Sequence, residues 1–190
     1  MAEWYLRENE GSKKFAAVAR EKCMKTEILA KADQVVTRIL ETGDYEIHGD
    51  ETYAEIVEIA RQNWNEDSAW REQNRRPQIM PSDANLAVTF LRHERSNYDR
   101  ILSDVQYSLF GLETELFQWE LDNNPEFSSD DETHIEAFDD IKNMAHKEVR
   151  QRILTAIASK FPELSIEASR QSQSNFIMSG GQTHHVGRWH

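Results

Sequence analysis

Apolar side chains recur every three or four residues along most of this 190-residue chain, and this spacing constrains the fold more than any other feature. A helix places residues three and four apart on one face, whereas a strand alternates its side chains with a period of two. The one candidate strand, at 45–48, has no partner strand in the sequence. The chain is therefore predicted to be all-α and to pack as an irregular helical bundle with a flexible C-terminal tail.

The same spacing predicts three long helices and three shorter ones. The long helices are expected near 12–42, 82–110 and 130–161, and the short ones near 52–64, 112–122 and 163–169. Ser82 is a suitable N-cap, Gly111 a suitable stop, and Pro162 follows the last long helix. These signals predict a loose N-terminus at 1–11, a single helical domain at 12–169 and a flexible tail at 170–190.

The chain is strongly acidic, with a formal net charge of -12 from 34 acidic and 22 basic residues. Such a surface repels nucleic acids and anionic membranes unless a local basic patch intervenes. No apolar run approaches the roughly 20 residues that cross a bilayer, and the first residues lack the apolar core of a signal peptide. We expect a cytoplasmic protein of bacterial or phage type that makes no membrane contact.

Acidic residues concentrate between 113 and 140, where eleven acids occur without any Lys or Arg. Aromatic residues interleave them, as in an interaction surface that docks a basic protein. Ser129 and Glu132 have the spacing of a capping box, which gives some of the acids a structural explanation. The partner-binding residues predicted on this basis are Phe117, Trp119, Glu120, Asp130 and Asp131.

A second interpretation uses the arginine-rich connector "WREQNRRP", which offers cations and an indole for phosphates and stacked bases. It predicts single-stranded nucleic-acid binding through Trp70, Arg71, Arg75 and Arg76, if Arg92, Arg95 and Arg100 converge on the same patch. The structural alternative is a solvated connector with Trp70 tucked against the bundle.

A third interpretation concerns "LRHERSNYDRIL", where His93 lies close to a carboxylate and to arginines. Such a histidine could perform acid–base chemistry in a hydrolase or transferase. The simpler interpretation, which we favour, turns His93 toward water and joins Arg92, Glu94, Arg95 and Asp99 in exposed ion pairs.

Together with the later segment "HKEVRQRILTAIASKFPEL", this stretch resembles short uncharacterised bacterial proteins. In those proteins an R-H-x-x-x-x-Y-D helix precedes a helix of V-R-x-x-I type. The resemblance implies no assigned activity, and it marks His93, Tyr98 and Asp99 as the positions to test for catalysis.

Other site signatures are absent from the sequence. There is no Glu-x-x-His pair, no phosphate-binding glycine loop and no nucleophile elbow, and Cys23 is the single cysteine. We therefore expect no cofactor and no metal. The leading hypothesis is a non-enzymatic protein that binds a basic protein partner, and homodimerisation stays open as an alternative.

Overall fold

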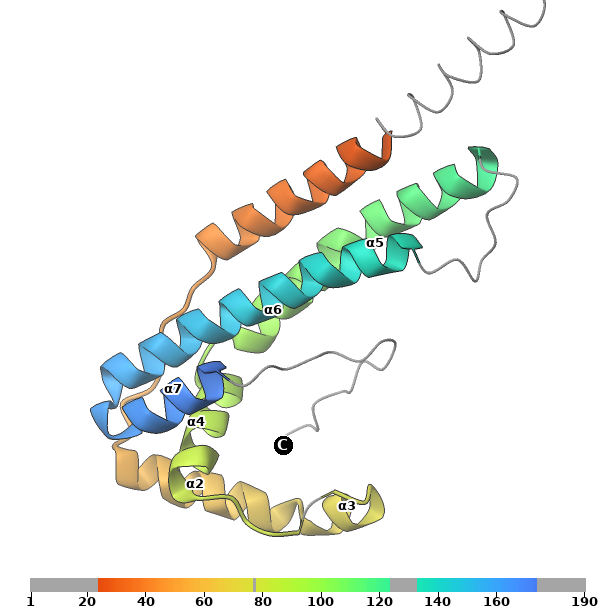
Figure 1. The fold of residues 1–190 in the computed structure, drawn as a ribbon. Helices are drawn as coiled ribbons and strands as arrows, with labels where there is room; N and C mark the ends of the chain where they lie inside the picture. Colours follow the sequence, from red (N-terminus) through yellow and green to blue (C-terminus); the bar gives the residue numbers. More distant parts are fainter. Residues whose placement is uncertain (1–23, 77, 124–132, 174–190) are drawn as a thin grey trace, which may run out of the picture.

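The computed structural model describes residues 24–76, 78–123 and 133–173, and every regular element in these ranges is helical. The predicted all-α class is confirmed, and the segment 45–48 forms a loop rather than a strand. Figure 1 shows the helices arranged as an elongated, irregular bundle.

Three long helices lie side by side (Figure 1): the helix over 24–42, α5 (Tyr98–Asn123) and α6 (Thr133–Lys160), of which α6 continues to the other end of the molecule. Their apolar faces meet in a common core, because residues at helical spacing become buried together. The fully buried residues of this core include Ile28, Ala32, Val36, Leu109, Leu116, Phe138 and Ile153.

Shorter helices complete the other end of the molecule. They are α2 (Tyr53–Glu66), α3 (Ser68–Gln73), α4 (Asp83–Glu94), the 3-10 turn η1 (Pro162–Leu164) and α7 (Ser165–Gln173). The short helix predicted near 52–64 is confirmed as α2, and its apolar residues at helical spacing, Ile56, Val57 and Ala60, are buried. Helix α4 packs against α2, α6 and α7, and α3 projects at the tip of the molecule (Figure 1).

Capping residues explain where the short helices begin. Thr52 forms a capping box with Glu55 at the start of α2, and the Ser82 hydroxyl accepts a hydrogen bond from the Asn85 amide at the start of α4. The N-cap predicted at Ser82 is therefore confirmed.

The helix predicted over 82–110 is broken at 95–97, so it forms the separate helices α4 and α5. The Ser96 hydroxyl donates to the Arg92 carbonyl and accepts from the Tyr98 amide, and it thereby competes with the helical hydrogen bonds. The Arg95 carbonyl accepts instead from the His48 amide of the preceding loop, at 2.8 Å. Local polar contacts outweigh the apolar period at this point.

The stop predicted at Gly111 is wrong, because α5 continues through this glycine to Asn123. A single glycine costs a helix only about 1 kcal/mol, and the buried residues Leu109 and Leu116 on either side hold the helix to the core.

Near the C-terminal end of the described residues, α7 extends to Gln173, past the predicted domain boundary at 169.

The predictions for residues 1–23, for Ser129 and Glu132 and for the tail beyond 173 lie outside the described residues. Among the helices that the structure describes, none has the length and apolar character needed to cross a membrane.

Candidate functional site

Polar side chains from four helices meet where α4 turns into α5. We call this group the polar cluster. Its members are Arg92, His93, Tyr98, Asp99, His146 and Gln171. The break at 95–97 creates it, because the turn carries the start of α5 back beside the last turn of α4.

His93 stands at the centre of the polar cluster with a side chain only 7% exposed. Its Nδ1 donates to Asp99 Oδ2 at 2.8 Å, and its Nε2 accepts from Arg92 Nε at 3.2 Å. An imidazole nitrogen that accepts a hydrogen bond carries no proton, so this arrangement describes a neutral His93. The nitrogen that would act as a base is covered by the guanidinium of Arg92.

Tyr98 and His146 form the inner wall of the polar cluster. The Tyr98 ring meets the His93 ring edge-on with centroids 5.2 Å apart, and its hydroxyl lies 3.5 Å from His146 Nδ1. Burial raises the pKa of Tyr98 and lowers the pKa of His146. Both shifts favour the neutral forms of these two side chains at neutral pH.

A chain of hydrogen bonds leads from the polar cluster to α7. Arg92 Nη1 donates to Gln171 Oε1 at 3.2 Å, and Gln171 Nε2 donates to Glu167 Oε1 at 2.9 Å. Glu167 also accepts from Asn85 of α4 and from Arg170, which lowers its pKa to about 2, mainly through the Arg170 hydrogen bond. These contacts join α7 to α4 through polar groups.

The expectation that His93 points toward water is therefore wrong, since the helix break turns its ring inward against Tyr98. The predicted ion pairs among Arg92, Glu94, Arg95 and Asp99 are also not formed. Arg95 pairs with Glu51 at 2.7 Å, and Asp99 contacts His93. The structure does bring together the three residues that the resemblance marks, namely His93, Tyr98 and Asp99.

Helix α5 also carries a mostly apolar row of side chains on the side opposite its buried residues. We call this row the outer face of α5. It consists of Tyr107, Phe110, Thr114, Phe117 and Leu121, which follow one another at steps of three and four residues. Tyr107 and Phe110 are 79% and 69% exposed, Leu121 is exposed, and Phe117 is half-buried. Rows of this kind are typical of helix-to-helix contacts.

An acidic edge flanks the outer face of α5. Asp104, Glu115 and Asp122 are exposed at helical spacing along one side of the row. Arg100 reaches Asp104 at 3.7 Å, and no other Lys or Arg occurs on α5. The face therefore combines aromatic groups with negative charge.

The predicted partner-binding residues that the structure describes do not lie on one surface. Phe117 belongs to the outer face of α5, whereas Trp119 is half-buried against the core. Glu120 is buried and lies 3.8 Å from Lys25, so it holds the helix over 24–42 rather than facing a partner. Asp130 and Asp131 lie outside the described residues.

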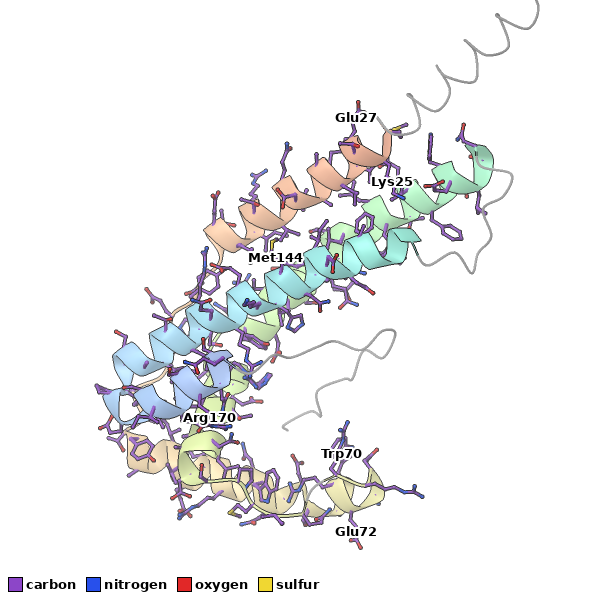
Figure 2. All side chains as sticks on the ribbon, viewed as in Figure 1. Lys25, Glu27, Trp70, Glu72, Met144 and Arg170 are labelled. Atoms are coloured by element: carbon purple, nitrogen blue, oxygen red, sulfur yellow. The ribbon has the colours of Figure 1, made fainter. Side chains whose placement is uncertain are left out.

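The arginines proposed for nucleic-acid binding do not converge. Arg71 is buried with its guanidinium 3.7 Å from the Trp64 ring centroid, and Arg92 belongs to the polar cluster. Trp70 projects from α3 at the tip of the molecule and is exposed rather than tucked against the bundle (Figure 2). Arg75 and Arg76 are exposed in the loop that follows.

A depression in the described surface lies over a third region, helix α2. This shallow, open depression is lined by charged and amide side chains, of which Arg61 already pairs with Asp83 at 2.7 Å. Among the described residues no group of three or more His, Cys, Asp or Glu side chains could hold a metal ion.

Comparisons of the chain with protein-family models, with curated proteins and with solved structures find no match. The resemblance to uncharacterised bacterial proteins thus stays a prediction, and the function must be argued from the two sites.

Sequence reasoning missed the most exposed residues of the outer face of α5. The signal was present, because Tyr107, Thr114 and Leu121 are spaced by seven residues, as are Phe110 and Phe117. The stop assigned to Gly111 divided this row between two predicted helices. His146 and Gln171 were also missed, since sequence spacing gives no sign that they approach His93.

Proposed function

We propose that this protein binds a partner protein, and that the outer face of α5 takes up a basic amphipathic helix of that partner. Exposed Phe110 is the observation that carries the proposal. It is 69% exposed beside the fully buried Leu109, and it is the central aromatic of the row. Isolated exposed apolar residues are common on proteins, but a regular row of them marks an interaction surface.

The spacing of the row supports a helical partner. From Tyr107 to Leu121 the face extends about 21 Å, at 1.5 Å per residue. A partner helix of about 14 to 16 residues with apolar groups every three or four positions would cover it. Aromatic side chains such as Tyr107 and Phe110 supply large contact area for such an interaction.

The charges beside the row support a basic partner. Asp104, Glu115 and Asp122 lie along one edge, so Lys or Arg side chains on the partner helix would meet opposite charges there. A second copy of this chain would instead bring the same acidic edge against itself. The charge pattern thus favours a different protein over a homodimer.

Site-directed photo-cross-linking tests this proposal in cells that produce the chain. A photoreactive phenylalanine analogue at Phe110 should capture a partner through a basic helical segment, whereas the same analogue at Gln151, exposed on α6, should not. With purified proteins, the Phe110→Glu variant should not bind the captured partner. Rising salt should weaken the binding of the partner to the parent chain. Cross-links to a second copy alone, or equal capture from both positions, would refute the proposal.

A further inference from the structure

Gly111 gives the exposed side of α5 a position without a side chain. It is exposed and lies inside the helix, one residue after Phe110. A glycine inside a helix lowers its stability relative to alanine, because a more mobile backbone has to be ordered. Glycine is therefore expected in a helix only where a larger residue would collide with a neighbour or where the backbone needs a positive φ.

Neither reason for a glycine exists within the part of the chain that the structure describes. A Cβ atom at Gly111 would meet no atom within 4 Å beyond its two chain neighbours and its own stretch of helix backbone. The backbone of Gly111 is helical, unlike that of Gly49, whose φ is 92°. A close contact with another molecule explains the glycine better than any contact within the chain.

The surroundings of Gly111 form a hole of the kind that helices use to pack together. Four residues at positions i, i+3, i+4 and i+7 of one helix receive a single side chain of a facing helix. The outer face of α5 and Gly111 supply such a set, which we call the notch: Tyr107, Phe110, Gly111 and Thr114. Gly111 lies on the side of the notch that borders the acidic edge, and its missing side chain makes the notch deeper there.

The walls of the notch suit an apolar side chain. Tyr107 and Phe110 are 79% and 69% exposed, so their rings are open to a partner. The Thr114 hydroxyl donates to the Phe110 carbonyl at 2.8 Å, so it needs no acceptor from outside. One heptad further along α5, Gln118 takes the place that Gly111 has in the notch, and its longer side chain leaves less room in the equivalent hole.

We propose that the notch receives one large aliphatic side chain of the basic partner helix and so sets where that helix lies along α5. The notch rests on the proposed function of the outer face of α5. A leucine or methionine would cover the rings of Tyr107 and Phe110, whereas an alanine would leave them in water. A partner shifted by seven residues would meet Gln118 instead of Gly111 and would fit less well, so Gly111 selects the register.

Fluorescence anisotropy with two designed peptides tests the notch on the full chain. The first probe is a labelled helical peptide of about 15 residues that carries lysines beside its apolar row and a leucine at the centre of that row. The second probe has alanine in place of the central leucine. The parent chain should bind the leucine peptide about tenfold more tightly than the alanine peptide.

Substitution of Gly111 should remove this preference. Gly111→Leu fills the notch, so the affinity for the leucine peptide should fall about tenfold or more, while the alanine peptide should lose little. Ser108→Leu, at an exposed position of α5 outside the row, is the matched control and should change either affinity by less than about twofold. Gly111→Leu should also raise the urea midpoint, because leucine favours the helix and meets no atom of a neighbouring element there. Weaker binding by a more stable variant cannot come from damage to the fold.

The results distinguish a failed notch from a failed docking surface. Binding of the leucine peptide that Phe110→Glu abolishes and Gly111→Leu leaves unchanged would show that the outer face of α5 binds a basic helix without the notch. No binding of either peptide to the parent chain would refute both the basic helix and the notch. Equal affinities of the parent chain for the two peptides would show that the notch receives no side chain.

Discussion

At the first turn of α5, Tyr98 is enclosed by His93 and His146, whereas two to three turns later Tyr107 and Phe110 lie open to solvent. One helix therefore buries polar contacts at its start and exposes aromatic groups along its outer side. The buried contacts have partners and hold four helices in one arrangement, which is how polar groups add to specificity inside a fold. The exposed aromatics add little to folding, so a contact outside the chain explains them better.

Two neighbouring residues on opposite sides of α5 should differ most in their effect on stability. Leu109 is fully buried, so Leu109→Ala should lower the free energy of unfolding by about 2 to 5 kcal/mol. Phe110→Ala removes a larger side chain but should change that free energy by less than about 0.5 kcal/mol. Urea denaturation measures both changes. Equal losses would mean that Phe110 is packed within the fold, and the outer face of α5 would lose its role.

Leu109 and Phe110 also show how much of the fold could be predicted from the sequence. The period of the apolar residues predicted an all-α bundle, and Leu109 is buried as helical spacing requires. The same period could not reveal the break at 95–97, which depends on the Ser96 hydroxyl and on the His48 amide from a distant loop. A single local contact of this kind redirects the chain and buries His93.

The candidate sites were harder to predict than the fold for a related reason. The sequence marked His93, Tyr98 and Asp99, which lie within seven residues of one another. It could not supply His146 and Gln171, since these approach only after α6 and α7 pack. Nor could counting acids show that Glu120 is buried, because its ion-pair partner Lys25 comes from the distant helix over 24–42.

The polar contacts between α4 and α7 should make stability depend on pH in the acid range. The pKa of Glu167 is lowered from 4.5 to about 2, so its carboxylate stabilises the fold fully above about pH 4.5. That contribution is lost as the pH falls from about 4.5 toward 2, where the side chain takes up a proton. Since Arg170 is largely exposed, we expect the loss to be about 1 kcal/mol or less.

Urea midpoints measured between pH 6 and 2.5 on the parent chain and on Glu167→Gln isolate this effect. The parent should lose its advantage over the variant as the pH falls. Glu163→Gln, at an exposed neighbouring position, serves as the control and should follow the parent. An advantage that persists unchanged to pH 2.5 would show that Glu167 does not join α7 to α4 by its charge.

Substitution of Arg71 should have the smallest effect on stability, because Arg71 is a buried polar residue whose donors lack partners. It is 6% exposed, and its Nε and Nη1 are buried without a hydrogen-bond partner. Arg71→Met removes these donors and leaves no acceptor unpaired, while it loses the stacking of the cation on Trp64. The two changes oppose each other, so the free energy of unfolding should stay within about 1 kcal/mol of the parent. Arg71→Lys should be the more damaging substitution, since it keeps a charge in the buried position but replaces the flat guanidinium. A loss above about 2 kcal/mol for Arg71→Met in urea denaturation would show that burial of a polar group stabilises this fold even without hydrogen bonds.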